Sequence, residues 1–236
     1  MNFETDKVRV PLWLIWTIAV VLATAACGVW YYEVDATSTK ALGLAGGLLT
    51  GLLVYLATFL TLLRPIQELD RFHRMGIKAL LANRHEKGYY RQLVARSKFR
   101  VDVLGASCRR FVLDFLDQAS DDAVLVDALN KNPNLKVRLL IPTDAYMGDE
   151  AKSGVAATLN RVEELQNRFG SRVELRRFDD KARHSFVMAD SDLVAGPVFE
   201  DDNSRHAPAV HVEVGTSFGQ KYSAYFEDLW EHAEIA

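Results

Sequence analysis

The chain has 236 residues, with 28 Lys and Arg against 31 Asp and Glu, a formal net charge of -3 and 49% hydrophobic residues. These averages resemble an ordinary soluble domain and conceal two long segments, residues 10–32 and 41–63, that contain no charged residue. The rest of the chain is far more polar, which excludes both a wholly soluble protein and a polytopic transporter. Two cysteines, Cys27 and Cys108, are too few for a disulfide scaffold or a Cys-based zinc site.

Each apolar segment is long enough to cross a membrane. A helix of this length covers about 34 Å, against a hydrocarbon core of about 30 Å. Trp13, Trp16 and Trp30 lie toward the ends of the first segment, as expected for aromatic rings at the lipid headgroups. Few residues separate the segments, so the sequence predicts a hairpin of two transmembrane helices, over about residues 10–32 and 41–63.

Basic residues set the expected orientation. Two precede the first segment, and residues 64–100 hold ten basic and three acidic residues. By the positive-inside rule we predict a multi-pass protein of the bacterial inner membrane with its N- and C-termini in the cytoplasm. The alternative is a cleaved signal or lipoprotein signal, because small residues precede Cys27. We favour the hairpin, because Glu4 and Asp6 are unlike a signal's basic start.

Small residues recur every four positions in both apolar segments, at Gly43, Gly47 and Gly51 in the second and at Ala19 and Ala23 in the first. This spacing lets helix backbones approach closely in lipid. We therefore predict a packing face, within the hairpin or between subunits of a homo-oligomer. The alternative is that small residues are simply common in membrane helices. Neither segment contains an ionisable acidic or basic residue, which argues against a proton relay or charged ion pathway.

Charge is segregated along the rest of the chain. Residues 64–100 carry a net charge of +7 and residues 101–236 a net charge of -9. Apolar residues recur at near-helical spacing after Pro65, which predicts a basic amphipathic linker helix within residues 64–90, lying against lipid headgroups or the following domain. The alternative is a plain linker that carries the positive-inside signature. Nucleic-acid binding is disfavoured because the following domain, residues 91–236, is acidic.

The cytoplasmic domain has an α/β pattern. Strands are expected at residues 99–107, 135–142, 172–178, 185–189 and 210–214, and helices at residues 109–130, 153–169 and 219–235. The alternation predicts a largely parallel sheet with helices on both faces.

One segment resembles a known motif. His184-Ser-Phe-Val-Met-Ala-Asp-Ser-Asp, followed by Leu-Val-Ala-Gly-Pro, resembles one half of the phospholipase D-like fold. In that family a His-x-Lys sequence is followed by Asp, and two copies form a phosphodiester-cleaving site. Here Phe186 stands at the lysine position and Ser191 at the aspartate position, between Asp190 and Asp192.

The resemblance covers about residues 90–236 and implies a phospholipase D-like α/β domain with a degenerate motif. Phosphoryl transfer depends on cations that stabilise phosphate oxygens, and phenylalanine supplies none. We predict a domain that binds rather than catalyses. The alternative is a membrane-tethered homodimeric phosphodiesterase acting on lipid or nucleic acid, with His184 catalytic and Arg183 or Lys181 replacing the lysine.

Five residues are candidates for ligand binding. Arg109 and Arg110 follow a strand at the sheet's carboxyl edge, where open α/β folds bind ligands, and they could hold an anion. His184 is a further candidate for contact with a ligand. His206 and His211 could bind metal or phosphate, but no Cys or acidic partner stands at a diagnostic spacing, so we favour structural roles for them. We predict no metal and no cofactor.

The overall layout resembles the two-transmembrane effectors of bacterial antiphage systems, retron-type systems among them. The resemblance implies a toxin-like membrane effector in antiviral defence, whose cytoplasmic domain binds a partner or anionic signal and whose hairpins then perturb the inner membrane. The expected partners are membrane lipid, further copies of the chain, and a regulatory protein or nucleic-acid-containing complex that holds the effector inactive. A membrane scaffold that localises a partner is the remaining alternative.

Overall fold

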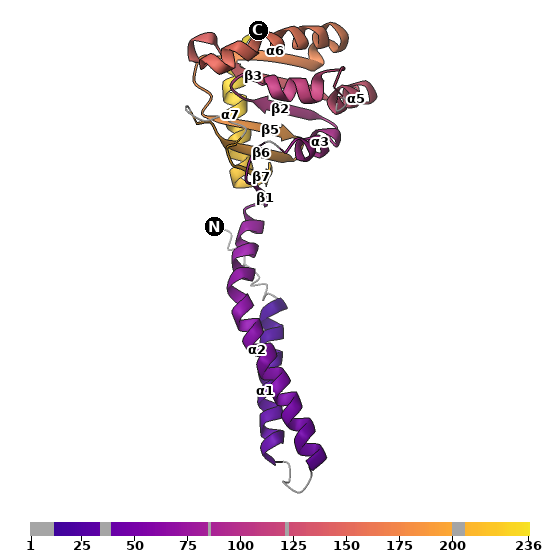
Figure 1. The fold of residues 1–236 in the computed structure, drawn as a ribbon, viewed down its shortest axis with the longest axis vertical. Helices are drawn as coiled ribbons and strands as arrows, with labels where there is room; N and C mark the ends of the chain where they lie inside the picture. Colours follow the sequence, from indigo (N-terminus) through magenta and orange to yellow (C-terminus); the bar gives the residue numbers. More distant parts are fainter. Residues whose placement is uncertain (1–11, 34–38, 85, 121–122, 200–205) are drawn as a thin grey trace, which may run out of the picture. The chain divides into compact units, whose positions relative to one another are not determined.

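The computed structural model describes residues 12–33, 39–84, 86–120, 123–199 and 206–236 (Figure 1). The chain divides into two compact units, Met1–Asp70 and Arg71–Ala236. The first unit is helical, and the second holds a mixed sheet with helices on both faces.

The first unit contains the expected pair of apolar helices. Helix α1 spans Leu12–Glu33, and helix α2 spans Thr39–Arg74. Ile15–Glu33 and Thr39–Leu62, with mean hydropathies of 1.6 and 1.8, are long and apolar enough to cross a membrane by length and composition. Residues 10 and 11 of the first predicted segment lie outside the described residues.

The two helices pack through positions spaced three and four apart, the pattern of a coiled-coil seam. In α2 the shielded positions include Leu42, Ala45, Leu49, Leu52, Leu56 and Phe59. Ala45 is fully buried, and a Cβ on its neighbour Gly46 would lie 3.3 Å from the ring of Tyr31 in α1. The close approach is therefore made by Ala45 and Gly46.

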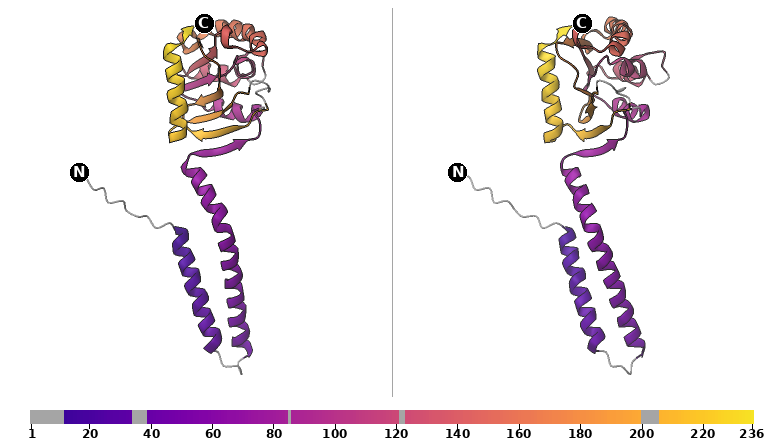
Figure 2. Two further views of the ribbon diagram at one scale, coloured as in Figure 1. Left: turned by 90° about the vertical axis from the view of Figure 1, so that its left-hand side faces the viewer. Right: turned by 60° about the vertical axis from the view of Figure 1, so that its left-hand side comes forward.

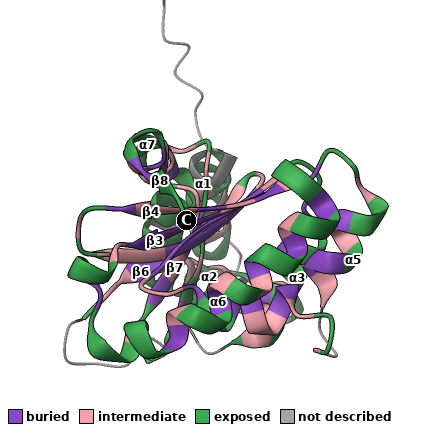
Figure 3. Cartoon of the chain, turned by 90° about the horizontal axis from the view of Figure 1, so that it is seen from above, coloured by how far each residue is buried: buried purple, intermediate pink, exposed green. Residues whose placement is uncertain are grey.

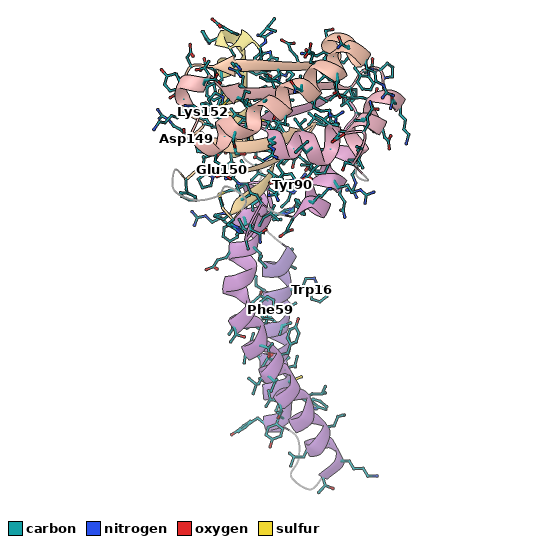
Figure 4. All side chains as sticks on the ribbon, turned by 45° about the horizontal axis from the view of Figure 1, so that its top comes forward. Trp16, Phe59, Tyr90, Asp149, Glu150 and Lys152 are labelled. Atoms are coloured by element: carbon teal, nitrogen blue, oxygen red, sulfur yellow. The ribbon has the colours of Figure 1, made fainter. Side chains whose placement is uncertain are left out.

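The predicted small-residue face is not this seam. A Cβ placed on Gly43, Gly47 or Gly51 would meet no described atom within 4 Å, and Ala19 and Ala23 are exposed. The prediction that these residues pack within the hairpin is thus wrong, because the helices contact along a neighbouring stripe of α2. Other exposed side chains of this unit also point outward, such as Trp16 in Figure 4.

The region after the apolar helices differs from the predicted linker helix. Helix α2 continues through Pro65 to Arg74, and strand β1 then spans Ile77–Leu81. Alternate residues of β1 are shielded, and β1 pairs with a distant strand. Its apolar residues fit a strand period as well as a helical one, so tertiary pairing decides the structure. Helix α3 follows at Lys87–Ala95.

The sheet has eight strands in the order β1-β7-β6-β5-β2-β3-β4-β8. The strands after β1 are β2 Arg100–Leu104, β3 Lys136–Pro142, β4 Val173–Phe178, β5 His184–Ala189, β6 Asp192–Pro197, β7 Ala209–Glu213 and β8 Glu234–Ile235. Only the β2–β3 and β3–β4 pairs are parallel among the described strands. The prediction of a largely parallel sheet is wrong, because a tight turn at Asp190 (φ 51°) makes β5 and β6 a hairpin.

The helix predicted over residues 109–130 is two shorter pieces. Helix α4 spans Arg109–Phe111 and runs into the π-helix η1, Val112–Leu116, whereas α5 spans Val124–Lys131. Between them, the Asp117 carboxylate accepts the backbone N–H of Ala119 at 2.9 Å and binds Arg161 at 2.9 Å. A local side-chain bond of this kind competes with the helical pattern and ends it.

Two hydrophobic cores lie on the two faces of the sheet. Helices α3, α5 and α6 (Asp149–Phe169) cover one face, and α7 (Ser217–His232) covers the other, as Figure 2 shows. Strand residues alternate between the cores: Val103 and Val187 belong to the first, Leu104 and Phe186 to the second. Figure 3 shows the strands largely buried and the outer sides of the helices exposed. This alternation decides which face each candidate site residue occupies.

Candidate functional site

His184 is the first residue of β5, and it lies against aromatic residues of α7. Its ring contacts Tyr222 edge-on at a centroid distance of 5.4 Å and Tyr225 at 6.1 Å, and the Tyr222 hydroxyl is 3.5 Å from Nδ1. Burial lowers the pKa of His184 from its ordinary value, and the positive charges of Arg84 and Arg183 lower it further. The imidazole is therefore neutral at neutral pH and is held by its aromatic neighbours.

Phe186, which stands at the lysine position of the motif, is buried. Phe186 is 2% exposed and contacts Tyr222 and Phe226 edge-on at 5.5 and 6.0 Å. Phe186 thus belongs to the core under α7, and the side chain at this position has no open surface on which to meet a phosphate.

The residues at and beside the aspartate position, Asp190 to Asp192, form contacts that stabilise the fold. Asp190 accepts the backbone N–H groups of residues 98–100 at 2.7 to 3.0 Å, which joins the β5–β6 turn to the start of β2. The Ser191 hydroxyl donates to Asp192 at 3.3 Å. These groups stabilise the turn, and none of them is directed at His184.

His211 lies across the sheet from His184, on the face covered by α3. It is 8% exposed, its Nε2 is 2.8 Å from Asp192, and its Nδ1 is 2.5 Å from the Tyr89 hydroxyl. Burial opposes ionisation of Asp192, but hydrogen bonds from Lys78 and His211 outweigh it and lower the pKa of this carboxyl.

His206 is exposed in the turn before β7, so it does not share the environment of His211. Within the described ranges, no group of three or more His, Cys, Asp or Glu is placed to hold a metal ion.

Arg109 and Arg110 line a pocket of about 250 Å³ at the carboxyl end of β2. Both are exposed, and the aliphatic part of Arg109 lies over Gly154 of α6, where a Cβ would be 2.7 Å from its Cδ. Ser107 and Ser185 also line the pocket. Ser185 alternates with His184 and Phe186 along β5 and faces the side that α3 covers, and Phe186 also borders the pocket.

Arg84 is the residue of this region that sequence reasoning missed. It follows β1, lines the same pocket, and its Nη2 donates to the Pro197 carbonyl of β6. Its Nε and Nη1 atoms are buried and have no hydrogen-bond partner in the part of the chain that the structure describes. Burial lowers the pKa of this guanidinium. In the sequence, Arg84 is one of many basic residues after the apolar segments, and only the β1–β7 pairing distinguishes it.

The nucleophilic side chains of the pocket have no base beside them among the described lining residues. Burial raises the pKa of the Cys108 thiol to about 12, so the thiolate is not populated at neutral pH. The Ser107 carbonyl accepts the Thr158 hydroxyl at 2.9 Å. No histidine is among the described residues that line the pocket, and its one carboxylate, Asp114, lies between Lys87 at 3.5 Å and Arg110 at 3.9 Å. No general base is therefore positioned there for a serine nucleophile.

No protein-family model matches the chain, and no curated protein matches it in sequence. Among solved structures it is similar to TrmBL2, an archaeal chromatin protein described with a novel mode of DNA binding, at 12% identity and a TM-score of 0.44, over 84% of this chain and 70% of that one. It is also similar to Nuc, a phospholipase D family member from Salmonella typhimurium, at 13% identity and a TM-score of 0.43, over 64% of this chain and 90% of that one. NucT from Helicobacter pylori gives 11% identity and a TM-score of 0.43, over 67% and 98% of the respective chains. At such low scores and identities the likeness carries no argument about activity, and the site is interpreted from its own geometry.

Proposed function

We propose that this chain is a membrane-anchored, non-catalytic effector or sensor. Its sheet domain binds an anionic signal or partner, and its apolar helices then perturb the bacterial inner membrane, with both termini in the cytoplasm. The observation that carries the non-catalytic part is the burial of Phe186 under α7. A phosphoryl-transfer site at His184 would need a cation at that position, and the core leaves no room for one.

The membrane part rests on the two apolar helices. Large residues such as Trp16 and Leu22 are 66% and 64% exposed, which is costly in water and favourable in lipid. The exposed Gly43-Gly47-Gly51 face remains available for a second copy of the chain, which supports the proposal of a homo-oligomer.

The antiphage role, with a regulatory protein or nucleic-acid-containing complex that holds the effector inactive, is proposed from the layout of two apolar helices followed by an α/β domain. Induced expression of the full chain in bacteria should depolarise the inner membrane, as a potential-sensitive dye reports. Depolarisation that depends on His184 would oppose this proposal, and depolarisation that survives His184→Ala would support it.

The alternative, a phosphodiesterase of two chains, is favoured by one observation. The charge of Arg84 acts on His184, whose pKa is lowered, so a neutral imidazole lies within the influence of a cation. The decisive assay uses the purified full chain with bis(p-nitrophenyl) phosphate, a phospholipid and single-stranded DNA. We expect no turnover. Hydrolysis that His184→Ala abolishes would establish the enzyme and refute the non-catalytic proposal.

A further inference from the structure

Two pockets lined by described residues lie on the face that α3 covers, and they differ in charge. One, of about 370 Å³, lies beside His211, and its lining includes Arg96 and Lys98 together with Asp190 and Asp192. Its formal charges therefore cancel. The other, of about 250 Å³, lies at the carboxyl end of β2 and is called the β2 pocket below. Of these two, the β2 pocket has the large excess of positive charge.

The excess comes from four basic side chains, Arg84, Lys87, Arg109 and Arg110, against the single carboxylate Asp114. The formal net charge of the lining is +3. The rest of the domain is acidic, so the β2 pocket is a local positive region on a negative background. Such a concave site concentrates anions of matching size.

We propose that the β2 pocket binds the phosphate group of a ligand. This proposal rests on the proposed function, because it identifies the chemistry and the location of the anionic signal. Most of the pocket's lining lies on the face that α3 covers, but Phe186 of the degenerate motif also borders it, so the pocket lies at the end of the sheet near that motif. A phosphate group carries up to two negative charges on three oxygens, which suits a lining of charge +3.

Arg84, one of the lining residues, contributes strongly to the positive charge of the pocket. Its Nε and Nη1 atoms have no partner among the described atoms, and the acceptor of its Nη2 atom is the uncharged Pro197 carbonyl. No described carboxylate forms an ion pair with Arg84, so its charge is not cancelled locally. Because its Nε and Nη1 atoms are buried, the charge of Arg84 is screened less than that of a fully exposed arginine.

The remaining lining offers donors and space. Ser107 and Ser185 are among the lining residues, and their hydroxyl groups can donate hydrogen bonds to an anion. Burial raises the pKa of Tyr90 to about 12, so its hydroxyl keeps a proton to donate at neutral pH. Phe111 adds an apolar wall against which a group carrying the phosphate can pack.

The test is calorimetric titration of the full chain, purified in a phosphate-free maltoside detergent, with inorganic phosphate and with pyrophosphate. We expect saturable binding of at least one probe. Arg109→Gln and Arg110→Gln should each weaken it by about tenfold or more, which corresponds to one charge-assisted contact. The matched control is Arg96→Gln, which removes an exposed arginine from the charge-balanced pocket and should leave the affinity unchanged.

A second arm identifies the source of the phosphate. In nanodiscs of phosphatidylcholine alone, pyrophosphate should bind as in detergent. If nanodiscs containing phosphatidic acid abolish pyrophosphate binding, the site takes a lipid headgroup, and if they do not, it takes a soluble phosphate. Either result supports a phosphate site.

Two results would overturn the proposal: no saturable binding of either probe, or equal weakening by Arg96→Gln and Arg109→Gln. Failure of the proposed function has a separate signature. Hydrolysis that His184→Ala abolishes refutes the non-catalytic role, whether or not the β2 pocket binds phosphate.

Discussion

Replacing Phe186 by lysine restores the residue type of the phospholipase D-like motif and tests whether the position is still usable. Full burial of a phenylalanine side chain contributes about 1.5–3 kcal/mol. Each of its two edge-on contacts, with Tyr222 and Phe226, contributes about 0.5–1.5 kcal/mol. The ring therefore contributes about 2.5–6 kcal/mol to the stability of the sheet domain. A buried ammonium would add a desolvation penalty to this loss.

In a domain of this size, 1 kcal/mol corresponds to about 2–4 °C in Tm. We therefore expect Phe186→Lys to lower the Tm by about 5 °C or more, and to restore no phosphodiesterase activity. The measurements are thermal unfolding of the full chain in detergent, followed by near-ultraviolet circular dichroism, and the turnover of bis(p-nitrophenyl) phosphate. Phe186→Leu is the control, because it keeps an apolar side chain and should lose no more than half as much. A Phe186→Lys protein that melts at the native temperature, or that gains turnover, would refute the reasoning.

Three further outcomes follow from the same domain. Arg138 binds the fully buried Asp102 through Nε at 2.7 Å and Nη2 at 2.9 Å, and Arg100 also contacts Asp102 at 2.8 Å. Arg138→Met should therefore cost about 1.5–3 kcal/mol in urea unfolding, because Arg100 still pairs with the carboxylate, and a cost no larger than that of the more exposed Arg176→Met would contradict this. In an NMR titration, His184 should show a pKa below about 6.5, and Arg84→Met should move it upward. Because the pKa of His184 is lowered in the folded state, the stability that His184 contributes is present above about pH 6.5 and is lost as the pH falls through the folded-state pKa. A titration midpoint of His184 at its ordinary value would contradict this. Arg84→Met itself should raise the free energy of unfolding in urea by about 1 kcal/mol, because it removes buried donors that lack partners among the described atoms. A variant less stable than the native protein would contradict this explanation.

The central strands could be predicted because local signals agree with their burial. β3 contains the apolar run Leu139–Ile141, which Pro142 ends, and Gly170, in the left-handed region at φ 62°, ends α6. The position of Arg109 and Arg110 at the edge of the sheet follows from the same logic, since both come directly after β2. Sequence order alone therefore located one wall of the β2 pocket.

The rest depends on contacts that sequence order does not reveal. Ile77–Leu81 fits two periods, and its strand form comes from pairing with β7, more than a hundred residues away. The same pairing carries the loop after β1 to β6, where Arg84 meets Pro197. Phe186 could be identified as a departure from the motif, but only the packing of α7 shows that the position is closed.

Adjacent glycines of α2 allow a final test of how the apolar helices work. A Cβ on Gly46 would approach the Tyr31 ring at 3.3 Å, whereas a Cβ on Gly47 would meet no described atom within 4 Å. Gly46→Leu should therefore disturb the contact between α1 and α2, at a cost of about 1–3 kcal/mol for overpacking. Among the described residues Gly47→Leu should leave that contact intact, so we expect any effect it has to come from contacts with another copy of the chain.

The measurement is chemical cross-linking of the full chain in bacterial membranes, combined with the depolarisation assay. If copies associate through the Gly43-Gly47-Gly51 face, Gly47→Leu should reduce both cross-linked oligomer and depolarisation. Ala57→Leu, which also adds an apolar side chain at an exposed position of α2 but lies off the Gly43-Gly47-Gly51 row, is the matched control and should leave both unchanged. Unaltered oligomers and undiminished depolarisation with Gly47→Leu would remove the glycine face from the mechanism, because a leucine cannot occupy a close helix–helix contact that needs glycine without separating the helices.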